Sequence, residues 1–175
     1  MKKLLYLFLA VSFIFTACKK EEGCTDSIAT NYNADAEDDD GSCIFGLIGV
    51  WSTTNVIIDS TITVTVGGIL DPTQSGSGSE TLTAEDAEFP TSVEFLSNGT
   101  AYALHSYDPT EDDTSNYSIS GNTLTVTSTD EDPMDFEYTV DKTTLTLVMS
   151  IDTSVSMPPV EMSASFSQTM NFNRE

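Results

Sequence analysis

The sequence predicts an all-β protein, an antiparallel meander of about eight to ten strands. Apolar residues recur at every second position through most of residues 47–175, and short turn signals separate these alternating runs. No part of this region keeps apolar residues at helical spacing. Each strand is therefore expected to have one buried face and one face in water.

The runs can be placed in order along the chain. Ser97-Asn98-Gly99 predicts a hairpin turn before TAYALHSY. Gly121-Asn122 and Asp141-Lys142 predict two further turns. The apolar positions of the predicted strands are Val93, Phe95, Tyr117, Ile119, Leu124, Val126, Phe136, Tyr138, Val140, Leu145, Leu147, Met149, Ile151, Met162, Ala164, Phe166, Met170 and Phe172.

The alternation weakens between residues 61 and 89. TITVTVGG has the composition of a strand, whereas DPTQSGSGSE is polar and rich in Gly and Ser. We interpret the second stretch, residues 71–80, as a long surface loop of the kind that can gate the mouth of a barrel.

A meander with one apolar face buries that face by closing into a barrel or by folding into a sandwich. LIGVW (47–51), SVEFLSNGTA (92–101), YSISGNTLTV (117–126) and TTLTLVM (143–149) occur in an order that resembles the lipocalin-like domains of small bacterial lipoproteins. The resemblance implies an up-and-down barrel over residues 46–175, with Trp51 closing one end. The alternative is an immunoglobulin-like β-sandwich, but the Cys-Trp-Cys arrangement of that fold is missing from the sequence.

An apolar cavity inside such a barrel would bind a small apolar ligand. Methionines gather beside phenylalanines in the last third of the chain, and their flexible thioethers suit adaptable apolar sites. The same side chains would equally fill a packed core. The alternative function is then a surface adhesion or assembly module without a ligand. The predicted ligand-binding residues are Trp51, Phe95, Leu104, Phe136, Met149, Met162 and Phe166.

The first 18 residues predict export and a lipid anchor. Lys2 and Lys3 precede an apolar run that is shorter than the roughly 20 residues needed to cross a bilayer. The sequence FTAC resembles a bacterial lipobox, which implies that residues 1–17 form a signal peptide and that Cys18 carries lipid. Several acyl chains on one residue give a stable anchor.

Residues 18–23 would then form the lipidated tether. The stretch KKEE at 19–22 resembles the signal that sends lipoproteins of some Gram-negative bacteria to the outer face of the outer membrane, although a solvated spacer would have the same composition. We therefore expect a lipid-anchored protein of the outer membrane, with the cell surface as one orientation.

Two cysteines bracket an acidic segment at residues 24–45. In an oxidising compartment, Cys24 and Cys43 are expected to form a disulfide. The segment resembles a short GCTD…NYN…DDGSC repeat of secreted proteins from Bacteroidetes-type bacteria, for which no chemistry can be carried over. Calcium is an alternative, because oxygen ligands alternate here as in a calcium loop, but Ala36 and Ser42 replace the Gly and Glu of an EF-hand. The candidate ligands are Asn31, Asn33, Asp35, Asp38 and Asp40.

Composition argues against two further classes of function. The formal net charge is −22, and such a surface repels phosphate backbones, so nucleic acid is not an expected partner. His105 is the single histidine, and no phosphate loop, HExxH or dinucleotide motif is present. We therefore predict no enzyme activity and no cofactor.

Overall fold

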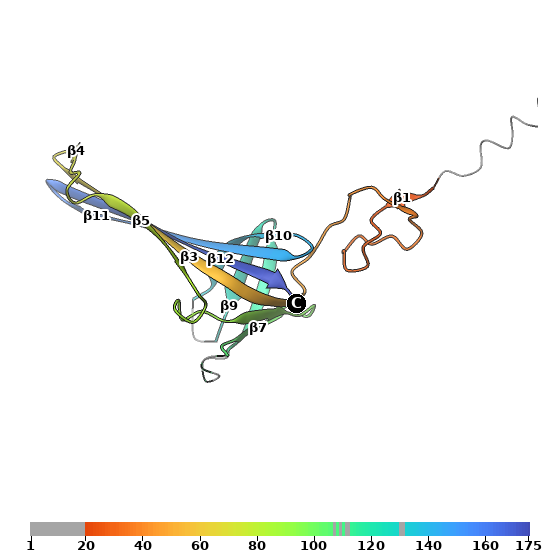
Figure 1. Ribbon diagram of the computed structural model, residues 1–175. Coiled ribbons are helices and arrows are strands. Elements are labelled where there is room, and N and C mark those ends of the chain that lie inside the picture. The colour runs from red at the N-terminus through yellow and green to blue at the C-terminus, as the bar shows by residue number, and fades with distance from the viewer. Residues whose placement is uncertain (1–19, 107, 109, 111–112, 130–131) are drawn as a thin grey trace, which may run out of the picture. The chain divides into compact units, whose positions relative to one another are not determined.

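The computed structural model describes residues 20–175, apart from 107, 109, 111–112 and 130–131 (Figure 1). The predicted signal peptide and Cys18 lie outside the described residues. The chain divides into two compact units at Gly46 and Leu47. In the first unit, β1 (Glu22–Gly23) pairs in parallel with β2 (Asp38–Asp39), and its other described residues form turns and loops.

The second unit is a closed antiparallel β-barrel of eight strands (Figure 1). Strands that are consecutive in this set along the chain pair with each other in the barrel. The last strand, β12, pairs with the first, β3, and closes the barrel. The predicted up-and-down barrel is therefore confirmed, and the sandwich is not formed. The eight strands are β3 (Gly49–Val66), β6 (Ser92–Phe95), β7 (Thr100–Leu104), β8 (Asp113–Ser120), β9 (Thr123–Thr127), β10 (Met134–Val140), β11 (Thr144–Met157) and β12 (Val160–Arg174).

The two ends of the barrel differ in the connections between their strands. The turns β6–β7, β8–β9 and β10–β11 lie at the end that holds Trp51. Gly99 and Gly121 take positive φ values of 84° and 60° in two of these turns, which a residue with a Cβ adopts with strain. We call this the closed end. The longer connections β7–β8 and β9–β10 lie at the opposite, open end.

The core occupies the closed half of the barrel. Trp51, Leu124 and Leu145 have no exposed surface, and Phe95 and Phe172 expose 1–2% of theirs. All of them belong to one contiguous cluster of buried side chains. The cluster is supplied by alternate positions of facing strands, as the period-two pattern predicts.

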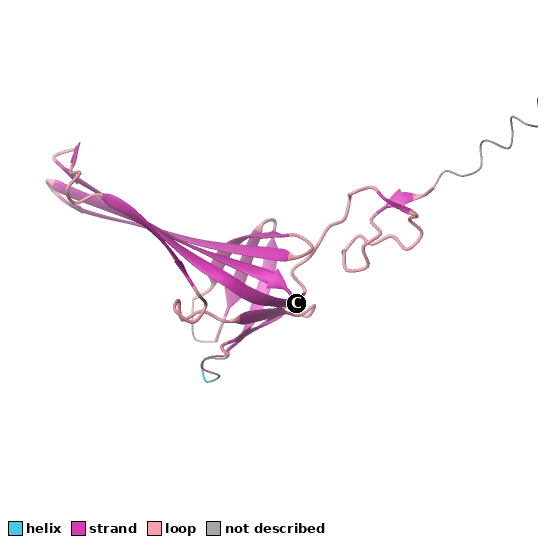
Figure 2. Cartoon of the chain, viewed as in Figure 1, coloured by secondary structure: helices cyan, strands magenta, loops and turns pink. Residues whose placement is uncertain are grey.

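Three strands continue beyond the barrel and form what we call the arm (Figures 1 and 2). It consists of residues 58–66 of β3, 150–157 of β11 and 160–167 of β12, joined by β4 (Ile69–Leu70) and β5 (Gly76–Leu82). β5 pairs with residues 56–62 of β3. The prediction of a loop over residues 71–80 is therefore wrong from Gly76 onward. A Gly/Ser stretch forms a strand here because β3 offers it a free edge to pair with.

Candidate ligand-binding site

A cavity of about 420 Å³ opens at the open end of the barrel, between β6, β7, β8, β9, β10 and β11. Its volume falls within the roughly 300–1,000 Å³ typical of small-molecule sites. Most of its lining is apolar, whereas its polar groups come from the strand ends and the adjoining segment. The lining residues are Glu88, Phe89, Pro90, Val93, Phe95, Ala101, Ala103, His105, Asp113, Ser115, Val126, Ser128, Met134, Phe136 and Leu147.

The apolar floor follows from the strand register. Val93 lies opposite Ala103, and Phe95 lies opposite Ala101, so two small side chains face two larger ones. The alanines leave space that larger residues in the same inward phase would fill. The edge of the Phe95 ring packs against Tyr117, with ring centroids 5.1 Å apart. Phe95 belongs both to the core cluster and to the cavity lining, so the core itself forms the floor of the cavity.

Residues 83–90, between β5 and β6, form one wall. The Thr83 hydroxyl accepts a hydrogen bond from the Asp86 amide, and the Phe89 amide donates to the Ala84 carbonyl over 2.8 Å. Glu88 has a positive φ of 52°, which is strained for a residue with a side chain. This compact turn places Phe89 in the cavity lining, and the centroid of its ring lies 6.4 Å from that of Phe172.

Three hydrogen-bonded side chains form a polar group in the cavity wall. The hydroxyls of Ser115 and Ser128 lie 3.2 and 3.1 Å from Oδ2 of Asp113 and 2.8 Å from each other. The second carboxylate oxygen of Asp113 accepts from the Thr114 amide over 2.7 Å. Ser115 is 8% exposed. The cavity thus has an apolar floor and a strongly accepting polar patch.

His105 also lines the cavity, at the end of β7. Its imidazole interacts electrostatically with Asp108, whose pKa is lowered mainly by hydrogen bonds from Thr110 and to a smaller degree by His105. The prediction that His105 does not act in catalysis stays a prediction.

The predicted ligand-binding residues separate into three groups. Phe95 and Phe136 line the cavity. Trp51 is fully buried at the closed end, and Met149 packs against the core cluster. The other three, Leu104, Met162 and Phe166, are 41–43% exposed and do not reach the cavity.

The register explains why these three lie elsewhere. Ala103, not Leu104, faces inward, because Leu104 pairs with Ser92 in the outward phase of β6 and β7. Met162 and Phe166 are in the expected phase of β12, but they lie on the part of the strand that belongs to the arm. The seven residues therefore do not converge on one space.

The polar residues of the cavity were not anticipated from the sequence. Asp113 and Ser115 continue the inward phase of Tyr117 toward the start of β8, so extending that alternation backward would have found them. Ser128 similarly continues the inward phase of Val126. Phe89 has no such signal, because it is placed by a turn rather than by a strand.

Arg174 caps the closed end. Its guanidinium lies 4.1 Å from the centre of the Trp51 ring and donates to the carbonyls of Ile48 and Lys142 over 2.9 and 3.0 Å. The Trp51 indole donates to the Leu47 carbonyl over 2.7 Å. Burial lowers the pKa of Arg174, and nearby Asp141 partly offsets this effect. Trp51 thus closes this end, as the resemblance implies, and Arg174 holds it there.

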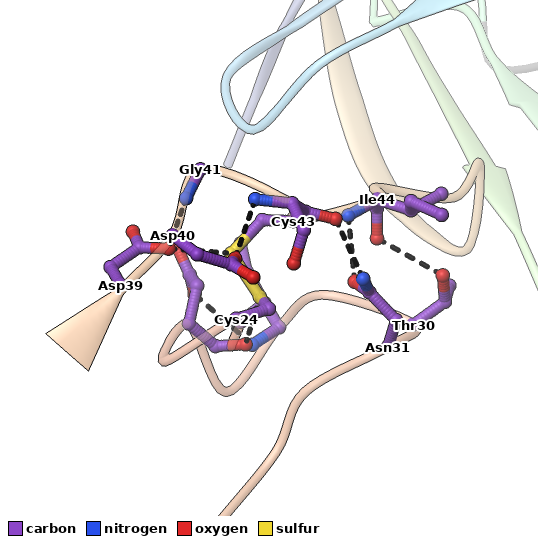
Figure 3. The surroundings of a disulfide bond; sticks show 11 residues. Cys24, Thr30, Asn31, Asp39, Asp40, Gly41, Cys43 and Ile44 are labelled. Carbon is purple, nitrogen blue, oxygen red and sulfur yellow. Dashed lines mark hydrogen bonds between the residues drawn. A yellow bond between two sulfur atoms is a disulfide. The ribbon is translucent and has the colours of Figure 1, made fainter. Parts of the chain in front are cut away.

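In the first unit, Cys24 and Cys43 form the predicted disulfide (Figure 3). Their sulfurs are 2.06 Å apart and their Cα atoms 4.8 Å apart. Asn31 ties the two sides of the loop together, because its amide oxygen accepts from the Ile44 amide over 2.7 Å and its nitrogen donates to the Ser42 carbonyl. The same hydrogen bond to Ile44 can be followed in Figure 3.

The candidate calcium ligands make contacts within the same segment. Asn33 accepts from the Asp35 amide, and Asp38 forms an ion pair with Lys20 at 3.0 Å. Hydrogen bonds from Ser42 lower the pKa of Asp40. Among the described residues, no three His, Cys, Asp or Glu side chains converge as a metal site would require. Calcium binding by Asn31, Asn33, Asp35, Asp38 and Asp40 stays a prediction.

No family model, no curated protein and no solved structure matches this chain. The likeness to lipocalin-like lipoproteins and to the disulfide repeat therefore remains a resemblance of motifs. In the part of the chain that the structure describes, no helix has the length and apolar character needed to cross a membrane.

Proposed function

We propose that the protein is a lipid-anchored lipoprotein of the outer membrane whose barrel binds a small apolar molecule. One observation carries the binding proposal: the inward phase of β6 and β7 pairs alanines with larger residues and leaves a cavity of about 420 Å³ above a packed core. Apolar cavities accept apolar guests because they are poorly hydrated. The predicted signal peptide and the lipobox-like FTAC support the anchor.

The binding proposal is tested by filling the cavity. N-phenyl-1-naphthylamine is an uncharged apolar dye whose fluorescence rises in apolar surroundings. We expect residues 18–175 carrying Cys18→Ser to bind it, and Ala103→Trp to abolish that binding without lowering thermal stability, because Ala103 borders empty space.

Met162→Trp is the matched control, since it adds the same side chain on the arm, where Met162 is 43% exposed. It should leave dye binding unchanged. If the wild-type chain binds no dye and Ala103→Trp loses roughly 1–3 kcal/mol of stability to overpacking, the barrel is a packed module and the proposal is wrong.

The anchor is tested separately in the native host. Full-length protein should partition with the outer membrane, and Cys18→Ser should release it or stop its processing. An unmodified Cys18 thiol in the mature native protein would contradict the anchor and leave the cavity proposal untouched.

A second candidate function, surface assembly, is favoured by the arm. Eight large apolar side chains on one face of the arm are 40–75% exposed. We call this set the apolar face of the arm: Ile62, Val66, Ile69, Ile151, Val155, Met157, Met162 and Phe166. On β3, β11 and β12 the opposite face of the arm consists of Ser, Thr and acidic residues, for example Thr63, Ser154 and Ser163 in one cross-strand row, and β4 adds the exposed Leu70.

The area of the apolar face of the arm fits a second copy of the chain as the binding partner. The eight side chains expose on the order of 800 Å², about what one partner contributes to a standard interface. Exposed apolar patches of this size mark interaction sites. Net negative charge on both copies opposes their approach, and salt screens that repulsion.

Sedimentation velocity at increasing salt tests the assembly function. We expect dimers that become more abundant as salt and protein concentration rise, and their loss in Val155→Ser/Phe166→Ser with the barrel still folded. The polar-face control Ser154→Ala should still dimerise. A chain that stays monomeric at all salt concentrations would exclude self-assembly through the arm.

A further inference from the structure

The cavity carries a feature that apolar binding alone does not need, namely the carboxylate of Asp113, which lines its mouth at an exposed position. Asp113 and Ser115 lie opposite Ala103 and Ala101 in the β7–β8 register, so they share the inward phase of β8 with Tyr117. An inward position in a small barrel is usually apolar. The three positions therefore change from aromatic to hydroxyl to carboxylate along the strand, from the core toward the open end.

The carboxylate is held in place by its neighbours. Ser128 reaches it from β9 over 3.1 Å, Ser115 from its own strand over 3.2 Å, and the Thr114 amide over 2.7 Å. A carboxylate has roughly four lone-pair positions, so these donors leave room for another. A ligand in the cavity would meet an acceptor that is already oriented.

The charges around the cavity have one sign. Asp113 and Glu88 contribute carboxylates, and the residues that line the cavity include neither Lys nor Arg. The two basic residues of the barrel domain lie at the closed end, where the Arg174 guanidinium donates to the Lys142 carbonyl. The His105 imidazole has Asp108 as its electrostatic neighbour. An anionic head group would therefore be repelled by Asp113 without a fixed cation to offset the repulsion.

We infer that the cavity selects apolar molecules whose polar end is a hydrogen-bond donor without negative charge, such as a long-chain alcohol or amine, and that it rejects fatty acids. This inference rests on the proposed apolar site and specifies its ligand class. The tail would lie on the floor formed by Phe95, Phe136 and Leu147, and the head would donate to Asp113.

Displacement of N-phenyl-1-naphthylamine by three ten-carbon probes tests the inference on residues 18–175 with Cys18→Ser, so that no acyl chain competes. Decylamine should bind at least about tenfold more tightly than decanoate at neutral pH. The ammonium group of decylamine is attracted by the Asp113 carboxylate, whereas the carboxylate of decanoate is repelled by it. Decanol should lie between them.

Asp113→Asn keeps the shape of the side chain and removes its charge. It should reduce the ratio of decylamine to decanoate affinity by about tenfold and change decanol affinity by less than about twofold. Asp135→Asn is the matched control: it removes the same charge from an equally exposed carboxylate that does not line the cavity. Asp135 lies on β10 opposite Thr125 and accepts a hydrogen bond from the Thr125 hydroxyl. It should leave the ratio unchanged.

The outcomes separate this inference from the proposed function. Dye binding with equal affinity for decanoate and decylamine would overturn the inference and leave the apolar site intact. Equal effects of Asp113→Asn and Asp135→Asn would also overturn it, because selection would then come from overall charge. No binding of dye or of any probe by a folded chain would overturn both.

Discussion

Strands β3, β11 and β12 each run through both the barrel and the arm. The two regions share one alternation of apolar and polar residues, but the apolar side chains are buried in the barrel and exposed in the arm. In the barrel, the inward phase of β12 holds Met170 and Phe172, which expose at most 1% of their surface. A few residues earlier, the same phase holds Met162 and Phe166, both 43% exposed. Alternation therefore determines which face of a strand is apolar, whereas the curvature and closure of the sheet determine whether that face is covered.

The largest test of this comparison substitutes the two phenylalanines of β12. Phe172→Ala should destabilise the barrel by about 3–5 kcal/mol, since it opens a hole in the core and removes the contact with Phe89. Phe166→Ala should change the free energy of unfolding by at most about 0.5 kcal/mol in the monomer. Denaturant titrations at low protein concentration measure both. Equal losses would show that the arm is covered and that the two regions do not differ.

The disulfide segment extends the comparison to a region with almost no core. In its described residues, Cys24 and Ala29 are the buried hydrophobics. Cys43→Ser should therefore destabilise this unit by roughly 3 kcal/mol, because the disulfide no longer restricts its unfolded chain. The unit should loosen, and the thermal transition of the barrel should stay unchanged. Hydrogen exchange resolved by residue would show the effect. A shift of the barrel transition would mean that the two units fold together.

A smaller effect separates two tyrosines in the barrel. The Tyr117 hydroxyl donates to the Leu96 carbonyl over 2.7 Å, and burial raises its pKa. The Tyr138 hydroxyl lies 3.5 Å from the Gly121 carbonyl at an exposed position. Tyr117→Phe should cost about 1 kcal/mol and Tyr138→Phe much less, because a partly buried hydrogen bond contributes more than a long exposed one. Equal values in denaturant titrations would contradict this ranking.

Much of the barrel could be predicted because its turns and its buried face leave marks in the sequence. Asn98-Gly99 and Gly121-Asn122 mark two hairpins that the structure forms, and Trp51 and Phe95 are buried as an inward phase requires. The disulfide could be predicted because two cysteines remain once Cys18 is assigned to the lipid anchor. These features are local, so one sequence is enough to find them.

The arm and the cavity could not be predicted in the same way. β5 is exposed along almost its whole length, so it has no buried phase and its GSGSETL sequence shows no alternation. Leu104 is predicted to lie in the inward phase of its strand, but the register with β6 places the small Ala103 there instead. The cavity exists because a small residue, Ala103, takes this inward position. Reading a sequence for buried residues picks out large apolar side chains, so it passes over such a position.

The smallest expected effect concerns acid stability at the closed end. Asp141, in the β10–β11 turn, accepts hydrogen bonds from the amides of Thr143 and Thr144, both over 2.7 Å, and from the Thr144 hydroxyl over 2.8 Å. The hydroxyl bond is the largest cause and the amide bonds follow, and together they lower the pKa of Asp141 to about 2. Because the folded-state pKa lies below the unfolded value, the stabilisation is fully present above pH of about 4 and is lost as the pH falls toward 2.

Asp141→Asn should therefore reduce the slope of stability against pH between about 4 and 2, with little change in that slope above this window. Thr144→Val removes the Thr144 hydroxyl, one of the donors to Asp141, and should give an intermediate slope. Denaturant midpoints measured across this range would test both variants. An unchanged slope in Asp141→Asn would show that the turn does not depend on the charged carboxylate.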